Sequence, residues 1–238
     1  MLELREKPLT YFAAEKRYVG LHLSAGKPRP AAMVVLLPDW RGQSGLSREH
    51  ARFLISLGYD VLIADLYGDG FSPTDSGQVG PMVKRLMENR GEGAAALAAC
   101  VKELLQQTRF SGPVFCLGYS AGGMIALDYG RSGADCAGII VCSALLKTAA
   151  PGMATKIKSP VLLLQGTQDA VSPMDVVTAL VKEMDAAEND FRFELFGQTH
   201  HAFDNPEAGT DPSARLVYSP ASATRARVAI AEFISSHL

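Results

Sequence analysis

A serine in a short glycine turn is the first residue of this chain whose surroundings favour covalent chemistry. Ser120 stands between Gly118 and Gly122, after the apolar segment 114–117 and before the apolar segment 124–127. This pattern predicts a strand, a sharp turn and a helix, which together present a serine hydroxyl at the edge of a sheet. Free N–H groups at the start of the helix can stabilise a developing negative charge. We therefore predict that Ser120 is a nucleophile.

An acid and a base follow the serine, each directly after a predicted strand. Asp169 follows the strand predicted over 160–165, and His200 and His201 follow the strand predicted over 191–196. In this order, histidine accepts the serine proton and returns it to the leaving group, while aspartate orients the imidazole. Two alternatives stay open at this point. Asp169 could have no role in catalysis and simply stabilise the start of the next helix. Only one of the two histidines is needed as the base, and the pattern does not say which.

The elements that must position these residues alternate along the chain. We predict further strands over 18–24, 31–37, 59–64 and 138–143, a turn over 26–30, and helices over 47–57, 82–89, 93–107, 173–187 and 221–237. The alternation predicts an α/β fold with a mostly parallel central sheet and helices on both faces, in which ligands bind beyond the carboxyl ends of the strands. Ser172 is the predicted N-cap of the helix over 173–187, and Ser143 is predicted to be a turn residue. No interdomain linker is visible, so residues 1–238 are predicted to form a single domain.

Composition argues against nucleic acid and membrane partners. The net charge is −2 and charged residues make up 20% of the chain, which provides no basic footprint for a polyanion. Residues 1–7 include acids and no apolar core, so no signal peptide is expected. No apolar run approaches the roughly 20 residues that span a bilayer. The expected location is the cytoplasm.

No cofactor or metal is predicted. The four cysteines lack C-x-x-C spacing: Cys100, Cys116, Cys136 and Cys142. Cys116 and Cys142 lie in apolar, strand-like runs and are expected to be buried, reduced thiols. His200 and His201 are adjacent, so they point in different directions, and they lack a third ligand at suitable spacing. No dinucleotide-binding glycine motif follows a first strand.

The chain resembles the dienelactone hydrolase family of α/β-hydrolases, from about residue 18 to the last helix. Four motifs carry the resemblance: Asp65-Leu66-Tyr67-Gly68, Gly118-Tyr119-Ser120-Ala121-Gly122-Gly123, Gly166-Thr167-Gln168-Asp169 and His201-Ala202-Phe203. The resemblance implies an α/β-hydrolase fold without a large cap domain. Because the family's base directly precedes a small residue and a phenylalanine, it also selects His201 over His200.

Three positions depart from the family's pattern. The usual nucleophile is a cysteine, where this chain has Ser120. A glutamate in the loop after the early buried strand is replaced by Asp39, and an arginine that holds a substrate carboxylate is replaced by Asn205. Because asparagine lacks the charge and the two-pronged geometry of arginine, we expect uncharged esters to be preferred over carboxylate-bearing lactones. Asp39 and Asn205 are therefore candidates for the substrate pocket.

The oxyanion hole is expected to consist of two backbone N–H groups. One belongs to the residue after the nucleophile, Ala121, and the other to the loop after strand 31–37, where we assign it to Trp40. As the only tryptophan, Trp40 could instead fill the core. Arg41 is the one basic residue placed near the site and is a pocket candidate. It could restore anion recognition from the opposite side, but we expect a solvated loop arginine. Tyr119, next to the serine, is a further pocket candidate.

These patterns together predict a serine hydrolase that cleaves small carboxylic esters or lactones through an acyl-enzyme. An acyltransferase or an amidase would use the same three side chains, so both stay open. A non-catalytic ligand-binding member of the fold is the third alternative, although binding alone does not require serine, aspartate and histidine in this order.

Overall fold

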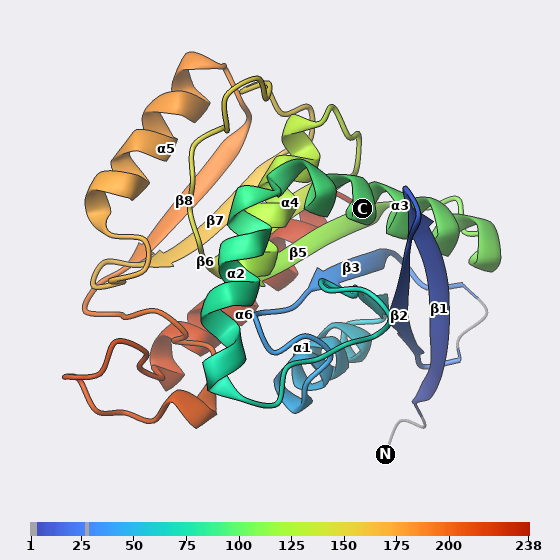
Figure 1. The fold of residues 1–238 in the computed structure, drawn as a ribbon, viewed down its shortest axis with the longest axis horizontal. Helices are drawn as coiled ribbons and strands as arrows, with labels where there is room; N and C mark the ends of the chain where they lie inside the picture. The colour runs from blue at the N-terminus through green and yellow to red at the C-terminus, as the bar shows by residue number, and fades with distance from the viewer. Residues whose placement is uncertain (1–3, 27–28) are drawn as a thin grey trace.

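The computed structural model of the protein describes residues 4–26 and 29–238, and these contain one eight-stranded sheet (Figure 1). The strands are β1 (Arg5–Ala13), β2 (Lys16–Ser24), β3 (Met33–Leu37), β4 (Asp60–Ile63), β5 (Val114–Ser120), β6 (Gly138–Ala144), β7 (Val161–Gly166) and β8 (Phe191–Phe196). Their order is β1-β2-β4-β3-β5-β6-β7-β8, with β3 to β8 parallel to one another and β1 and β2 antiparallel. The predicted mostly parallel sheet of an α/β-hydrolase is confirmed. Two short segments lie outside the described residues. They are residues 1–3, where the absence of a signal peptide is expected from the sequence, and residues 27–28, in the predicted turn.

Helices cover both faces of this sheet, as predicted. They are α1 (Gly45–Ser56), α2 (Val79–Glu88), α3 (Arg90–Thr108), α4 (Ala121–Arg131), α5 (Met174–Ala186) and α6 (Pro220–Ser236), with short helices η1 (Ser76–Gln78) and η2 (Pro206–Ala208). Successive residues of β3 alternate between two cores, because side chains along a strand point to opposite faces. Val35 and Leu37 belong to the core that includes α3, α4 and α5, and Val34 and Leu36 to the core that includes α1 and α6. A strand buried on both faces needs an uninterrupted apolar run, which is why this one could be predicted.

Strand β1 is absent from the predicted elements. It pairs with β2 at the edge of the sheet, where the rings of Tyr11 and Tyr18 stack with centroids 5.3 Å apart. Of its residues, Leu9 and Tyr11 are buried and most of the others are exposed. Pro8 is tolerated because an edge strand has a row of N–H groups without strand partners. Two buried apolar residues among mostly exposed neighbours form too weak an alternation to predict a strand from the sequence.

Four charged side chains form a buried network between α3, α4 and α5. Asp128 accepts hydrogen bonds from Arg90 at 2.6 and 2.7 Å and from Arg131 at 3.0 Å. Arg131 also contacts Glu183 at 2.5 Å. Both arginines and Glu183 hydrogen-bond the backbone of residues 147–149, so the network fixes the loop that follows β6.

Two predicted serine roles are wrong. Ser143 does not lie in a turn but within β6, where it is buried. Ser172 does not cap α5, which begins at Met174. Its hydroxyl instead accepts from the N–H of Leu146 at 2.8 Å and donates to the carbonyl of Ala144 at 2.9 Å. These partners are distant in sequence, and a local pattern cannot reveal them.

Candidate active site

Ser120 ends β5 and directly precedes α4, in the turn that its neighbours predict. Its backbone has φ of 50° and ψ of −117°, a strained conformation for a residue with a side chain. A Cβ on Gly118 would lie 2.4 Å from the carbonyl oxygen of Gly122, and one on Gly122 would lie 2.3 Å from that of Leu37. Only glycine fits at these two positions, because each is in direct contact with backbone. The tight turn presents the serine hydroxyl beyond the strand ends.

Ser120, Asp169 and His201 come together from three separate segments. Ser120 Oγ lies 3.1 Å from His201 Nε2, and His201 Nδ1 lies 2.7 Å from Asp169 Oδ2. Asp169 and His201 are both buried, at 2% and 5% exposure. These distances allow the imidazole to take a proton from the serine while the carboxylate holds the opposite ring nitrogen. Of the two adjacent histidines, His201 is the one that contacts the serine.

Four donors surround the carboxylate of Asp169. Oδ1 accepts from the backbone N–H groups of Val171 at 2.7 Å and Ser172 at 3.0 Å. Oδ2 accepts from Gln165 Nε2 at 2.5 Å in addition to His201. The carboxylate is therefore fixed in one orientation. Sequence reasoning missed Gln165, although a buried glutamine near the end of an otherwise apolar strand was the available signal.

Two side-chain hydrogen bonds hold the loop that carries His201: one comes from β6 and the other caps the short helix η2 within the loop. Ser143 Oγ accepts a hydrogen bond from the N–H of Ala202 at 2.8 Å. Asn205 Oδ1 accepts from the N–H of Glu207 at 3.0 Å, which starts η2. Ser143 was not predicted as a site residue, and its contribution is to position the histidine loop. Asn205 lies in the predicted pocket, but its carbonyl oxygen is occupied by this cap.

The loop that contains Trp40 is fixed by a network that starts at Asp65. The Asp65 carboxylate accepts hydrogen bonds from four backbone N–H groups, those of Val19, Tyr67, Gly68 and Gly70. The ordered turn directs the Tyr67 hydroxyl to the carbonyl of Trp40, at 2.7 Å. Trp40 is partly exposed and lines the cleft, so it does not fill the core. Ala121 opens α4, where the first N–H groups have no partner within the helix.

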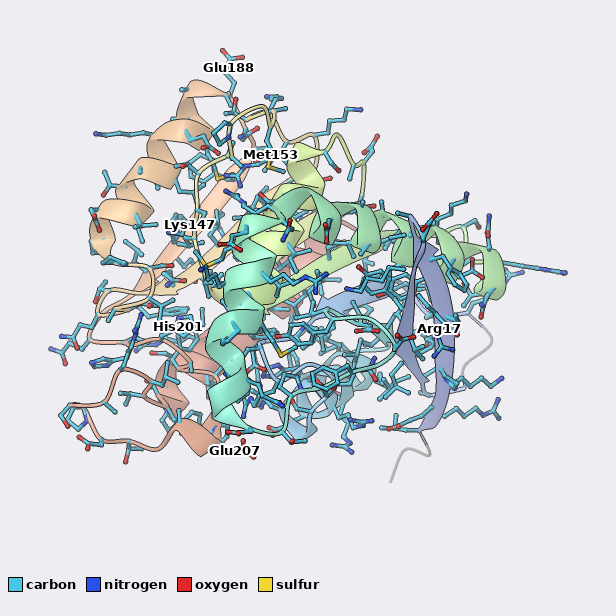
Figure 2. All side chains as sticks on the ribbon, viewed as in Figure 1. Arg17, Lys147, Met153, Glu188, His201 and Glu207 are labelled. Carbon is cyan, nitrogen blue, oxygen red and sulfur yellow. The ribbon has the colours of Figure 1, made fainter. Side chains whose placement is uncertain are left out.

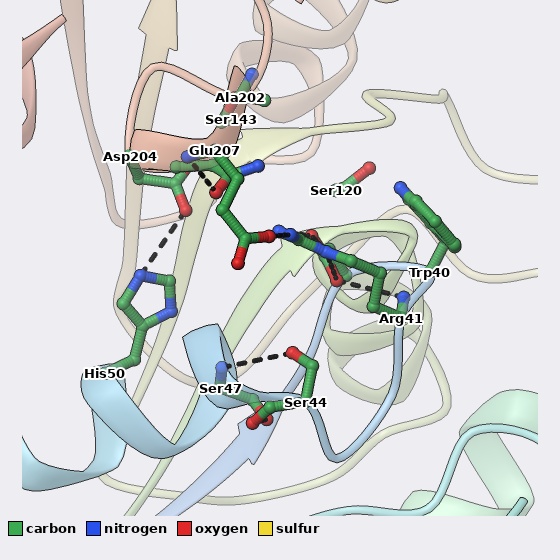
Figure 3. Close-up of polar contacts among 12 residues, drawn as sticks. Trp40, Arg41, Ser44, Ser47, His50, Ser120, Ser143, Ala202, Asp204 and Glu207 are labelled. Carbon is green, nitrogen blue, oxygen red and sulfur yellow. Dashed lines mark hydrogen bonds and ion pairs between the residues drawn. The ribbon is translucent and has the colours of Figure 1, made fainter. Parts of the chain in front are cut away.

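Asp39 and Arg41 form a fixed ion pair. The Asp39 carboxylate accepts from the Arg41 guanidinium at 2.7, 3.0 and 3.3 Å, and Arg41 Nη1 donates to Glu207 at 2.6 Å (Figure 3). Burial opposes the charge of Arg41, but the contacts with Asp39 and Glu207 outweigh it and raise the pKa of Arg41. The expectation of a solvated arginine is therefore wrong, because the side chain is 14% exposed and bridges two walls of the cleft. The partner Glu207 is 166 residues away in sequence, which no local pattern shows.

A further carboxylate, Asp204, lies in the cleft wall and was missed by sequence reasoning. Asp204 Oδ2 lies 3.4 Å from His50 Nε2 (Figure 3). The His50 ring stacks on Tyr119 with centroids 4.1 Å apart. Burial raises the pKa of Asp204 to about 6 and lowers the pKa of His50 to about 3. His50 is therefore neutral near pH 7, and it supports Tyr119 beside the serine.

Ser120 and His201 open into a cleft of about 1050 Å³. The predicted pocket residues all line it, together with Trp40: Asp39, Arg41, Tyr119 and Asn205. Most of the remaining wall is apolar and comes from α2 and from the loops after β6, β7 and β8: Val79, Val83, Met87, Leu145, Val171, Ala208 and Leu216. Lys147, which also lines the cleft, lies on the same side of α2 as His201 (Figure 2). The volume lies just above the range for clefts that bind drug-sized molecules, about 300–1,000 Å³.

Within residues 4–26 and 29–238, no group of three or more His, Cys, Asp or Glu side chains is arranged to hold a metal ion. None of the helices in this part of the chain has the length and apolarity that crossing a membrane requires. All four cysteines are free thiols, and Cys100, Cys116 and Cys142 are buried.

Comparison with known proteins gives one consistent result. The family model of the dienelactone hydrolase family matches residues 19–238. Among solved structures, a protein named m3DLH is similar with a TM-score of 0.91 and 27% identity, over 99% of each chain. A dienelactone hydrolase-like promiscuous phosphotriesterase from metagenomic libraries is similar with a TM-score of 0.90 and 25% identity, over 98% of each chain. A cold-adapted esterase from an Arctic intertidal metagenomic library shares the fold, with a TM-score of 0.76 and 13% identity over 100% of this chain and 96% of its own. No curated protein matches the sequence.

Proposed function

Because the chain belongs to the dienelactone hydrolase family, we propose that it is a serine hydrolase that cleaves uncharged carboxylic esters or lactones through an acyl-enzyme. One observation carries the proposal: a continuous path of close contacts runs from Ser120 Oγ through the His201 ring to the Asp169 carboxylate. Family membership supports hydrolase chemistry. The path supplies a nucleophile, a base and a group that orients the base.

In the proposed reaction, His201 Nε2 takes the proton of Ser120 while Oγ attacks the ester carbonyl carbon. The resulting tetrahedral oxyanion collapses, the bond to the leaving oxygen breaks, and that oxygen receives the proton from His201. Water then attacks the acyl-enzyme with His201 again as the base, which releases the acid and restores Ser120. The Asp169 carboxylate, 2.7 Å from Nδ1, stabilises the imidazolium.

The N–H groups of Trp40 and Ala121 are the proposed donors to the oxyanion. Their position supports this, since Ala121 follows the nucleophile and the loop of Trp40 lies against α4, with the carbonyls of Leu37 and Pro38 beside Gly122. Loss of one donor of this kind costs about 10²–10³ in kcat. The Tyr67 hydroxyl acts indirectly, because its bond to the Trp40 carbonyl restrains the loop.

An uncharged substrate is proposed because the cleft wall carries no net charge. Its four cations are matched by four carboxylates: Arg41, Lys84, Lys147 and Arg215 against Asp39, Glu88, Asp204 and Glu207. Arg41 is bound by both Asp39 and Glu207, so a substrate carboxylate would have to displace one of them to form a two-pronged contact.

The alternatives use the same site differently. An acyltransferase or an amidase would share the acyl-enzyme and differ in acceptor or leaving group, and a ligand-binding member would bind without turnover. Because one similar structure is named a promiscuous phosphotriesterase, a neutral phosphotriester also belongs in the substrate panel.

Covalent labelling with a fluorophosphonate tests the proposal. We expect an adduct on the peptide that contains Ser120, and a loss of several orders of magnitude in rate for Ser120→Ala. His201→Ala should abolish turnover of p-nitrophenyl acetate, whereas His200→Ala, the matched control, should keep a substantial fraction. An active enzyme labelled elsewhere, or not labelled, contradicts the proposal. Binding without labelling or turnover would favour the ligand-binding alternative.

A further inference from the structure

Helix α2 separates two hollows and presents a different apolar row to each. Val79, Val83 and Met87, spaced four residues apart, line the cleft that contains Ser120. Met82 and Leu86 line a second cavity of about 170 Å³, whose other walls include residues of β1, β2 and α3. Residues four apart lie on the same side of a helix. We call Val79, Val83 and Met87 the α2 row.

The α2 row is poorly covered by the protein itself. No residue of α2 is buried, whereas α5 buries three. The main neighbours of α2 are α3 and η1 rather than the sheet. Apolar side chains that face a cleft in this way keep their contact with water, and a ligand that covers them gains free energy by removing that surface from solvent.

The α2 row is continuous with the site of the proposed reaction. It lines the same cleft as Ser120 and His201, and the apolar residues Leu145 and Leu216 line that cleft too. Lys84 and Glu88, the charged residues of α2 in this cleft, lie 3.7 Å from each other and form an ion pair. The wall therefore offers an apolar strip flanked by charges that are already matched.

We propose that the α2 row binds an extended apolar acyl chain, so that the preferred substrates are esters of medium-length fatty acids. Positions 79 and 87 are separated by about 12 Å along the helix at 1.5 Å per residue. Because the single bonds of an extended chain, each about 1.5 Å long, zigzag and advance it by only about 1.3 Å each, this distance corresponds to an acyl chain of about ten carbons. The inference rests on the proposed function and gives it a substrate class, larger than the small esters that the sequence predicts.

A chain-length series tests the inference. The p-nitrophenyl esters of acetate, butanoate, hexanoate and octanoate differ only in methylenes, and each methylene that leaves water for an apolar wall is worth up to about fourfold. We expect kcat/KM to rise at least tenfold from acetate to octanoate. Val83→Asp should reduce the octanoate-to-acetate ratio to near one, because it places a charge on the wall.

Two further variants separate binding from folding. Val83→Phe narrows the cleft, so it should shift the preferred ester to a shorter chain. Leu86→Ala is the matched control, since it removes apolar bulk from the same helix on the side of the second cavity, and it should keep the wild-type ratio. Fluorophosphonate labelling of each variant reports that the site is folded.

Three results would overturn the inference. The first is an octanoate-to-acetate ratio of kcat/KM at or below one in the wild-type enzyme. The others are an unchanged ratio in Val83→Asp, or an equal loss of this ratio in Val83→Asp and Leu86→Ala. In these cases the adduct on Ser120 and the turnover of acetate would remain. Failure of the proposed function would remove both. The two failures are therefore distinguishable.

Discussion

Replacing Asp169 with asparagine should disable the enzyme through the orientation of one hydrogen atom. The carboxylate accepts from two backbone N–H groups through Oδ1, and from Gln165 and His201 through Oδ2. Asparagine has one acceptor oxygen and one NH₂ group. If its oxygen keeps the two backbone bonds, its NH₂ faces the amide of Gln165 and Nδ1 of His201.

In the Asp169→Asn variant, His201 can pair with the new NH₂ group only by accepting at Nδ1, which places its proton on Nε2. In this tautomer the nitrogen 3.1 Å from Ser120 Oγ is a donor and cannot take the serine proton. The same exchange in a serine protease triad costs about 10⁴ in kcat. We expect a loss of about 10³–10⁴, which corresponds to roughly 4–5.5 kcal/mol in the activation free energy.

Steady-state hydrolysis of p-nitrophenyl esters, with circular dichroism and thermal unfolding as checks of the fold, measures this loss. Asp175→Asn provides the matched control, because Asp175 is an exposed aspartate in the first turn of α5. It should retain wild-type kcat. If Asp169→Asn keeps more than about a tenth of kcat while folded, the tautomer argument is refuted.

Three further outcomes are expected. Glu207→Gln removes the negative charge that pairs with Arg41 Nη1 and leaves only a neutral acceptor there. The wild type should prefer the methyl ester over the corresponding ester that bears a carboxylate, and in the variant kcat/KM for the carboxylate-bearing ester should rise about ten- to a hundred-fold relative to the methyl ester. An unchanged ratio would show that Arg41 does not respond to substrate charge. The pKa of Asp204 is raised to about 6, so this group stabilises the fold at low pH and its contribution is lost as pH rises through 6. The pKa of His50 is lowered from 6.5 to about 3, so this group stabilises the fold above pH 6.5 and its contribution is lost as pH falls toward 3. Asp204→Asn removes only the first contribution, so the free energy of unfolding in urea should fall more steeply between pH 6.5 and 3.8 than in the wild type, and an equal or shallower slope would contradict this. Asp128→Asn leaves two buried arginines short of a partner and should cost about 3–5 kcal/mol in the urea-derived free energy of unfolding, with a loss below about 1 kcal/mol as the contrary result.

The three candidate catalytic residues could be predicted because each follows a strand with a clear local pattern. The apolar run before Ser120 and the glycines around it specify the turn without reference to the rest of the chain. Asp169 follows β7 and His201 follows β8, and the carboxyl ends of parallel strands meet at one edge of the sheet. Local patterns were sufficient wherever the structure is built from local contacts.

The supporting contacts could not be predicted, because they join distant segments. Ser143 and Ala202 are 59 residues apart, and Arg41 and Glu207 are 166 residues apart. Helix α2 shows a different limit. An apolar row has the same spacing in the sequence whether it packs on a core or faces a cleft. Only the structure shows that one row of α2 lines the cleft with Ser120 and the other lines the second cavity.

The spacing between the loop of Trp40 and the start of α4 is set by backbone, where Gly122 touches the carbonyl of Leu37. Side chains of the cleft wall take no part in this contact. Point mutations in the apolar part of the wall that α2 contributes can therefore accumulate over generations without moving the reacting groups, so descendants of this chain can change which substrates they accept and still inherit the chemistry intact. At Gly118 and Gly122 the opposite holds, since any side chain would force the backbones apart. Natural variation should concentrate in the wall and almost vanish at these two glycines.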